Sequence, residues 1–239
     1  MRPLAWAVTG AGHFLEEVFN LMTEVSQERQ ITAFVSRAAE EVIRVYGLWD
    51  KLHEISDGRR YSEVFTQLTE GESAIHAGRL AMGTYSALVV APATANTVAK
   101  VCLGISDTLV TNIVAQALKG CVHILVLPTD QSETAETTLP IRVEPSLCVG
   151  CHPCAAKEAC GTGAFTLSGG RGTMDYLRCV GCGLCLEACP HGAVRRGERI
   201  EIRAREVDLE NVERLRGMRG VTVLRSTEGL GAALSNLKG

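Results

Sequence analysis

The chain has 239 residues, of which 46% are hydrophobic and 5% aromatic, and its formal net charge at pH 7 is −3. This balance gives no bulk attraction to nucleic acid or to an anionic membrane, so neither is expected as a partner. No apolar run reaches the roughly 18 residues that a membrane-spanning helix needs. Ten cysteines, with no secretory signal in the opening residues, predict a cytoplasmic, reducing setting in which clustered thiols hold metal.

Strand-like and helix-like segments alternate through the first 130 residues. Strands are predicted at 3–10, 31–36, 86–94 and 122–130, and helices at 13–24, 37–55, 62–82, 95–104 and 106–120. This alternation predicts an α/β domain with a Rossmann-like (flavodoxin-like) parallel sheet and helices on both faces. Ligands of such sheets bind beyond the carboxyl ends of the strands, here Gly10, Ser36, Pro92 and Pro128.

The remainder of the chain changes character twice. Residues 131–140 form a polar stretch that is expected to be a linker, and the cysteine-rich region follows it. After residue 202 the α/β character returns, with a helix, the strand VTVL and a final helix. We therefore predict domains at 1–140 and 141–202, and we expect the tail at 203–239 to pack back on the first domain.

Two runs of four cysteines lie in the second region. The later run, C-x2-C-x2-C-x3-C-P, is the bacterial ferredoxin pattern, and the earlier run, C-x2-C-x2-C-x5-C-G, is a looser form of it. In ferredoxins with two clusters, the fourth cysteine of a run ligates the other cluster. This rule assigns one 4Fe–4S cluster to Cys148, Cys151, Cys154 and Cys189, and a second to Cys160, Cys179, Cys182 and Cys185.

The alternative for these cysteines is a pair of structural zinc sites. Zinc sites usually combine two C-x2-C pairs, whereas here a third cysteine repeats the same spacing in both runs. We therefore predict two 4Fe–4S clusters in a small α+β, bacterial-ferredoxin-like domain. Cys102 and Cys121 lie outside the runs and are interpreted as small core residues.

The glycine loop after the first strand, TGAGHF, fits the dinucleotide fingerprint poorly. Its third glycine position is Leu15, and Ser36-Arg37 stands where an acidic residue would bind a ribose hydroxyl. A hydroxyl and a guanidinium beside a helix N-terminus favour a phosphate group instead. The 2′-phosphate of NADP is an alternative ligand for this pair.

A second motif, APATANTVAKVCLGISDTLVTN at 91–112, resembles the flavin motif of the homo-oligomeric flavoproteins that include phosphopantothenoylcysteine decarboxylase and the flavin prenyltransferases. The resemblance implies FMN bound by three parts of the chain. These are the glycine loop (Gly10, Ala11, Gly12, His13), the hydroxyl of Ser36, and the motif itself (Pro92, Ala93, Thr94, Ala95, Asn96, Thr97, Asp107).

The chain departs from the decarboxylases after the fourth strand, where Pro128-Thr129-Asp130-Gln131 replaces their P-x-M-N-x-x-M element. His76 also lies farther from Pro92 than their catalytic histidine lies from the corresponding proline. We interpret His76 as an ordinary helix-face residue and keep it only as a weak catalytic candidate. A decarboxylase whose clusters act as sensors is therefore an alternative with little support.

The combination of a flavin motif, PTDQ, a ferredoxin segment and the tail VDLENVERLRGMRGVTVLRSTEGL resembles the archaeal-type dihydromethanopterin reductases (acceptor). The resemblance implies electron flow from ferredoxin or another low-potential donor, through the clusters and FMN, to 7,8-dihydromethanopterin. It also implies a homo-oligomer built from trimers, with a larger cage as one form.

The resemblance places the pterin against Pro128, Thr129, Asp130 and Gln131. Asp130 is the second weak catalytic candidate, because it is the only acid at a strand end and can bind the amino-pyrimidine edge or cap a turn. No residue stands out as the proton donor. The alternative to a pterin reductase is an electron-transfer module that reduces a protein partner.

Overall fold

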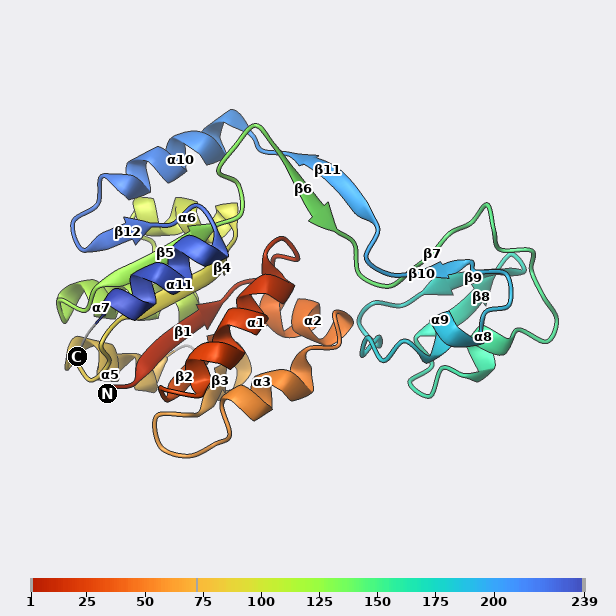
Figure 1. Ribbon diagram of the computed structural model, residues 1–239, viewed down its shortest axis with the longest axis horizontal. Helices are drawn as coiled ribbons and strands as arrows, with labels where there is room; N and C mark the ends of the chain where they lie inside the picture. The colour runs from red at the N-terminus through yellow and green to blue at the C-terminus, as the bar shows by residue number, and fades with distance from the viewer. Residues whose placement is uncertain (1, 72, 238–239) are drawn as a thin grey trace.

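The computed structural model describes residues 2–71 and 73–237, which form a larger and a smaller lobe joined by a two-stranded ribbon (Figure 1). The larger lobe contains one six-stranded parallel sheet with the strand order β12-β5-β4-β1-β2-β3. Its strands are β1 (Leu4–Val8), β2 (Ile31–Val35), β3 (Val64–Thr66), β4 (Leu88–Ala93), β5 (Ile124–Pro128) and β12 (Val221–Val223). The predicted parallel sheet is therefore confirmed.

The inner strands are continuous apolar runs because helices cover both faces of the sheet. Alternate residues of β1 enter different cores: Leu4, Trp6 and Val8 on one face, Ala5 and Ala7 on the other. The helices of this lobe are α1 (Leu15–Ser26), α2 (Arg37–Val45), α3 (Trp49–Ile55), α4 (Gln67–Glu70), η1 (Ile75–Ala77), α5 (Gly78–Ala81), α6 (Ala95–Cys102), α7 (Leu109–Lys119), α10 (Glu206–Arg216) and α11 (Thr227–Asn236).

Three sequence-based expectations about elements are wrong. The helix predicted over 37–55 is two helices, because Gly47 adopts a φ of +73° that ends α2. The helix predicted over 62–82 contains β3 and three short helical turns. The linker predicted over 131–140 contains β6 (Thr134–Thr138), a strand whose polar residues have solvent on both sides.

The smaller lobe is built between the strands of the ribbon. β6 pairs antiparallel with β11 (Arg199–Arg203), and the chain between them forms two short two-stranded sheets. These comprise β7 (Arg142–Val143) with β10 (Val194–Arg195), and β8 (Phe165–Ser168) with β9 (Arg171–Met174). Two short helices, α8 (Ala155–Glu158) and α9 (Leu184–Ala188), complete an α+β lobe that has a small core of its own.

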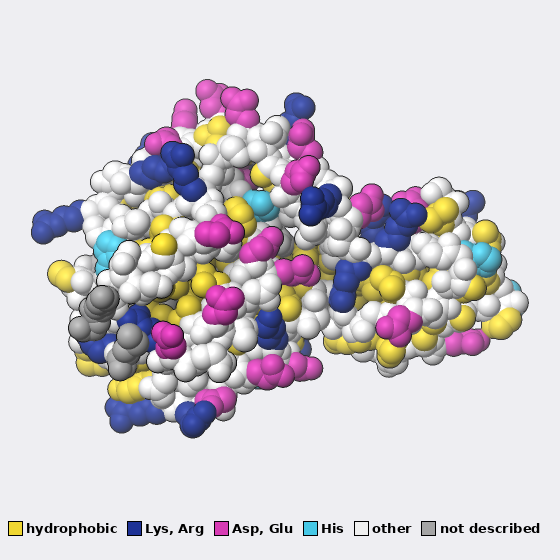
Figure 2. All heavy atoms as spheres, viewed as in Figure 1, with side chains coloured by type: hydrophobic (Ala, Val, Ile, Leu, Met, Phe, Trp, Pro, Cys, Tyr) yellow, Lys and Arg dark blue, Asp and Glu magenta, His cyan; other side chains and the backbone are white. Residues whose placement is uncertain are grey.

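After the smaller lobe the chain returns to the large sheet. β12 pairs in parallel with β5, with Val221 opposite Ile124, while α10 packs against α6 and α11 against α1. On the face shown in Figure 2, acidic and basic side chains are interspersed over both lobes. Within the ranges that the structure describes, no helix is both long and apolar enough to cross a membrane.

Candidate functional site: a nucleotide-type cavity and two cysteine groups

A cavity of about 520 Å³ opens at the carboxyl ends of the strands, where a parallel sheet is expected to bind its ligand. Its walls come from the ends of β1, β2 and β4, from α2, α4 and α6, and from the residues just before α7. The lining residues are Thr9, Gly10, Ser36, Arg37, Ala38, Gln67, Thr94, Asn96, Thr97, Lys100, Asp107 and Thr108.

Three helix N-termini meet at this cavity. Ser36, Thr94 and Thr108 cap α2, α6 and α7, each accepting the backbone N–H of the residue three positions later, at 3.1, 3.4 and 3.2 Å. Each N-terminus carries a partial positive charge and unpaired N–H groups, and Arg37 and Lys100 add two full charges to the same walls. The cavity therefore suits an anionic group such as a phosphate.

The glycine loop approaches α2 closely. A Cβ atom on Gly10 would lie 2.5 Å from the Cβ of Ala38, so this position requires glycine. The loop is also tied to the flavin-type motif, because the hydroxyl of Thr9 donates to the carbonyl of Pro92 at 2.7 Å and accepts the N–H of Thr94 at 2.8 Å. The two motifs, over eighty residues apart in sequence, thus form one wall.

The structure brings together part of the predicted cofactor set. The cavity is lined by Gly10, Ser36, Thr94, Asn96, Thr97 and Asp107, and its lining does not include Ala11, Gly12, His13, Pro92, Ala93 and Ala95. Asp107 forms an ion pair with Lys100 at 2.8 Å, and the hydrogen bond from this ammonium lowers the pKa of the carboxyl.

Sequence reasoning missed Thr9, Gln67, Lys100 and Thr108. Lys100 follows Asn96 by one helical turn, and this spacing could have indicated it. Gln67 was missed because the strand before it was not recognised.

His13 and Gly12 face a different cavity, of about 250 Å³, between the glycine loop and the ribbon. Its other lining residues are Phe14, Glu17, Glu136, Thr137, Thr138 and Arg199. Burial lowers the pKa of His13, and this effect outweighs the opposite influence of Glu17 and Asp130. His13 is thus held mostly neutral at the base of the ribbon.

The two weak catalytic candidates, His76 and Asp130, interact with neighbouring side chains. His76 contacts the buried carboxylate of Glu70 through Nδ1 at 2.6 Å and stacks on Phe65, with ring centroids 4.1 Å apart. It does not line the 520 Å³ cavity. Asp130 accepts the hydroxyl of Thr129 at 2.5 Å.

The four residues predicted to border a substrate, Pro128, Thr129, Asp130 and Gln131, lie together where β5 ends. The side-chain N–H of Gln131 donates to the carbonyl of Pro128 at 2.8 Å. Its carbonyl oxygen is buried and, among the described residues, has no hydrogen-bond partner. An unpaired buried acceptor of this kind suits a ligand N–H.

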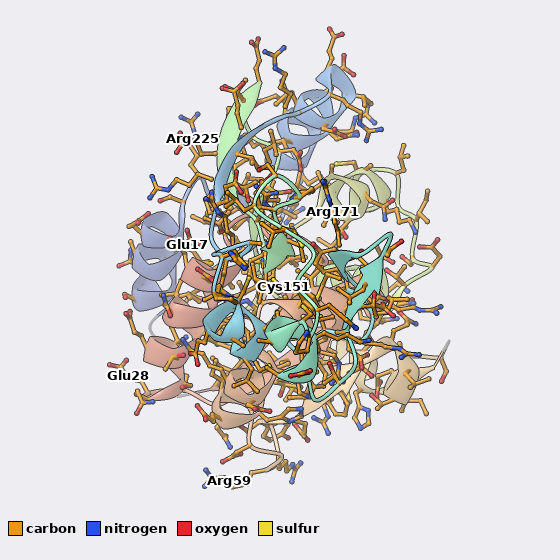
Figure 3. The ribbon with its side chains drawn as sticks, turned by 90° about the vertical axis from the view of Figure 1, so that its right-hand side faces the viewer. Glu17, Glu28, Arg59, Cys151, Arg171 and Arg225 are labelled. Atoms are coloured by element: carbon orange, nitrogen blue, oxygen red, sulfur yellow. The ribbon has the colours of Figure 1, made fainter. Side chains whose placement is uncertain are left out.

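The cysteines form two groups that cross the two runs. One cavity in the smaller lobe has Cys148, Cys151, Cys154 and Cys189 on its walls, among apolar residues such as Val143 and Phe165. Figure 3 shows Cys151 and Arg171 on this lobe, in front of the larger lobe. The Gly172 N–H donates to the sulfur of Cys148 at 3.2 Å and, as the main cause, lowers the pKa of that thiol.

The second group consists of Cys160, Cys179, Cys182 and Cys185. Burial, reinforced by the other thiols of the group, raises the pKa of Cys185 to about 11. Burial opposes ionisation of Cys160 as well, but hydrogen bonds from the Phe165 N–H at 3.2 Å and the Thr162 hydroxyl at 3.6 Å lower its pKa. Such N–H donors to sulfur stabilise thiolate ligands of iron–sulfur clusters.

The spacing of the groups bears on the metal they suit. Across residues 2–71 and 73–237, no three His, Cys, Asp or Glu side chains converge on a point where one metal ion could sit. A zinc ion needs four ligand atoms at about 2.0–2.3 Å from one centre. The four thiols of the Cys148 group line one cavity, and four cysteine thiolates are also the ligand set of a 4Fe–4S cluster.

Comparisons with known proteins agree with both halves of this site. Residues 1–142 match the Flavoprotein family, and residues 173–195 match the 4Fe-4S binding domain. The dihydromethanopterin reductase (acceptor) of Methanosarcina mazei is 41% identical over 95% of this chain and 96% of its own length. The protein of the same name from Methanocaldococcus jannaschii is 39% identical over 93% and 91%.

A solved structure extends the comparison to three dimensions. Burkholderia xenovorans DmrB, crystallised in complex with FMN and described as a cubic protein cage for redox transfer, superposes with a TM-score of 0.62. It is 30% identical, and the match covers 98% of this chain and 94% of that one. The chain therefore belongs to the Flavoprotein family and, within it, to the iron–sulfur dihydromethanopterin reductases (acceptor), which are oxidoreductases.

Proposed function

We propose that this oxidoreductase passes electrons from a low-potential donor through two 4Fe–4S clusters to FMN, and from FMN to 7,8-dihydromethanopterin. The observation that carries the proposal is the 520 Å³ cavity with its three helix N-termini, on a chain that also has two groups of four thiols. Relatives named for this reaction match nearly the whole chain. Bound FMN would convert single electrons into the hydride equivalent that a C=N bond accepts.

The residues of the cavity fit FMN. Arg37 and the N-termini of α2 and α6 would hold the phosphate, with Ser36 assisting, because these groups concentrate positive charge. Thr94, Asn96 and Thr97 would line the isoalloxazine. Asp107 would serve indirectly, by holding the ammonium group of Lys100 in position through their ion pair. The glycine at position 10 keeps the loop close to α2 and so shapes the cavity.

Each group of four thiols would hold one 4Fe–4S cluster. The support is the shared cavity of the Cys148 group and, for the second group, the packing of Cys160, Cys179 and Cys185 in the apolar cluster of the smaller lobe. Both groups combine cysteines from the two runs, as the crossed rule requires. This assignment can be tested one ligand at a time.

Ligand-by-ligand substitution separates the two clusters. Purified holoprotein should contain roughly eight irons per chain, because each cubane holds four. Cys148→Ser and Cys189→Ser should remove the same electron paramagnetic resonance signal, although the two residues belong to different runs. Cys160→Ser and Cys179→Ser should remove the other signal. If Cys148 and Cys160 variants lose the same signal instead, the crossed assignment is wrong.

The pterin would bind beside the end of β5. The unpaired oxygen of Gln131 can accept an N–H from the pterin, and Asp130 can accept from its amino group. No side chain is assigned as the proton donor for the second half of the reduction. We propose Gln131→Met as the test, with an expected rise in KM of about 10-fold, the effect of losing a hydrogen bond of roughly 1.5 kcal/mol.

The same proposal includes an oligomeric state, a location and an electron donor for this protein. The cage formed by DmrB supports a homo-oligomer for this chain, and the spacing of the cysteines in ferredoxin-type runs supports a cytoplasmic location. The donor would be ferredoxin or another low-potential one-electron carrier.

An anaerobic turnover assay decides the central proposal. Holoprotein reduced chemically should convert dihydromethanopterin to its tetrahydro form, whereas folate analogues serve as the specificity control. If the reduced protein leaves every dihydropterin unchanged but reduces a redox protein, it is an electron-transfer module and the reductase proposal fails. Bleaching of the flavin by NADPH alone would favour the nicotinamide alternative for Ser36-Arg37.

A further inference from the structure

The end of helix α2 packs directly on the smaller lobe. Val45, the last residue of α2, belongs to the same apolar cluster as Ile141 and Phe165 of the smaller lobe and two of its cysteines, Cys179 and Cys185. The chain then turns at Gly47 and lies against the loop that joins these cysteines. The N-terminus of α2 lines the 520 Å³ cavity, called the flavin-type cavity from here on, and its C-terminal end packs against cysteines of the second group.

Two glycines make this contact possible. A Cβ atom on Gly181 would lie 2.4 Å from the backbone nitrogen of Gly47 and 2.5 Å from the carbonyl oxygen of Val45. A Cβ atom on Gly47 would lie 2.9 Å from the carbonyl oxygen of Gly181. The same carbonyl accepts a hydrogen bond from the guanidinium of Arg196. The two backbones therefore meet at a distance that no side chain permits.

A cavity of about 630 Å³ lies beside this contact and spans both lobes. Arg37 and Gln67 line it as well as the 520 Å³ cavity, so the two cavities adjoin. From the smaller lobe, Tyr176, Leu177 and Cys179 line it. Of the eight cysteines in the two runs, all of which the structure describes, Cys179 alone lies on its wall.

The other group of thiols is placed differently. The cavity that contains Cys148, Cys151, Cys154 and Cys189 is lined only by residues between 143 and 194, all within the smaller lobe. No residue of the larger lobe contributes to it. The two groups thus differ in their access to the flavin-type cavity.

We propose that the group of Cys160, Cys179, Cys182 and Cys185 is the site that delivers electrons to the flavin, and that the Gly47–Gly181 contact positions it. This inference rests on the proposed function. A one-electron donor of low potential would reduce the cluster of the Cys148 group, which is reoxidised as its electron passes to the cluster of the Cys179 group. Each electron would pass on from the cluster of the Cys179 group to FMN, so that two such transfers, with two protons from solvent, would reduce one FMN.

Paired glycine variants test the role of the contact. Gly47→Ala and Gly181→Ala each insert a methyl group between the lobes. Gly58→Ala and Gly183→Ala are matched controls, because Gly58 and Gly183 also have left-handed φ values, +88° and +84°, but a Cβ atom would meet nothing within 4 Å. Gly183 also lies in the same cysteine run as Gly181.

The kinetic readout is the rate at which the flavin bleaches when reduced viologen is mixed with anaerobic holoprotein. A Cys179→Ser, Cys185→Ser double variant gives the background of direct flavin reduction. Above this background, Gly47→Ala and Gly181→Ala should slow bleaching several-fold, because the added methyl group moves the smaller lobe away from the larger one and electron transfer slows as the distance between the redox centres grows. Both controls should keep the wild-type rate.

A second readout is independent of turnover. Hydrogen exchange of peptides covering 44–48 and 178–184 should become faster in Gly47→Ala and Gly181→Ala and stay unchanged in the controls. Iron content and both paramagnetic signals should remain those of wild type. If Gly181→Ala loses iron, its slower bleaching cannot be assigned to the contact. The test then depends on Gly47→Ala, because Gly47 lies outside both cysteine runs.

Three results would overturn the inference. One is faster exchange at the contact with no change in the bleaching rate. A second is equal slowing in the controls, which would assign the effect to backbone strain. A third is loss of rapid bleaching in Cys148→Ser together with its retention in Cys179→Ser. Wild-type bleaching no faster than the background would instead refute the proposed electron path itself.

Discussion

Arg37 is the residue on which the proposed phosphate site depends most. It follows the N-cap of α2 and lines the cavity beside Ser36, with Lys100 on a neighbouring helix. Lys100 is already paired with Asp107, whereas no ion pair of Arg37 with an acidic side chain is found in the described part of the chain. The guanidinium is therefore available to a ligand phosphate.

Arg37→Met should weaken FMN binding by about 10- to 100-fold, because a hydrogen bond to a charged group contributes roughly 1.5–3 kcal/mol. Riboflavin, which lacks the phosphate, should bind the variant and the wild type equally. Fluorescence quenching with both ligands measures the difference. Arg59→Met is the control, because Arg59 is exposed and pairs with Asp57 away from the cavity. An equal loss for FMN and riboflavin would place the phosphate elsewhere.

Gly10→Ala should lower both stability and FMN affinity. The added methyl would lie 2.5 Å from the Cβ of Ala38, and overpacking of this kind costs about 1–3 kcal/mol. Gly78→Ala is the matched control, because a Cβ atom there meets nothing within 4 Å. Thermal unfolding and FMN titration of both variants give the comparison. A Gly10→Ala protein as stable as Gly78→Ala would contradict the close approach of loop and helix.

At the scale of elements, the hydroxyl of Tyr46 connects the end of α2 to the ribbon. It donates to the carbonyl of Thr138 in β6 at 2.7 Å. Burial, followed by the nearby carboxylates of Glu16 and Glu17, raises the pKa of Tyr46 to about 12. The folded state therefore retains this proton more strongly than the unfolded chain does.

The raised pKa of Tyr46 determines how its contribution to stability changes with pH. Below about pH 10 the tyrosine is protonated in both states and its full contribution is present; the contribution is lost as the pH rises toward 12. Tyr46→Phe should cost about 1 kcal/mol at neutral pH, the typical net value of one hydrogen bond. Between pH 9 and pH 11, the thermal midpoint of the variant should fall by less than the thermal midpoint of the wild type. Parallel falls would exclude Tyr46 as the titrating group.

Element boundaries show where local patterns were sufficient. The inner strands were predicted because continuous apolar runs bounded by glycine or proline need no distant information. β3 was missed because Val64–Thr66 is short, partly exposed and followed at once by a helical turn. β6 was missed because its partner, β11, lies about sixty residues later, and Ala135 is the one apolar residue in the sequence of β6.

At the scale of the whole molecule, exposed apolar residues lie beside the flavin-type cavity. Leu103 and Ile105, between α6 and α7, are 64% and 41% exposed. They lie between Lys100 and Asp107, two residues that line this cavity. We propose that these two side chains contribute to the subunit interface of the proposed homo-oligomer.

Leu103→Asp with Ile105→Asp should shift the protein to a smaller assembly, because carboxylates in an apolar interface lose their hydration without a partner. Light scattering after gel filtration measures the mass. Val207→Asp, on α10, is a control with a similarly exposed apolar residue, at 48%. An unchanged mass in the double variant would move the interface elsewhere.

The sequence by itself determined the parallel sheet and the flavin-type and cysteine motifs, because strand periodicity and the spacing of residues within a motif are local properties of the chain. Only the tertiary structure decided that β12 extends the sheet beside β5, that Gln67 reaches the cavity, and that Gly181 lies against Gly47. Each of these depends on contacts between segments far apart in sequence. Such contacts are set by packing and backbone approach, for which a linear pattern has no signal.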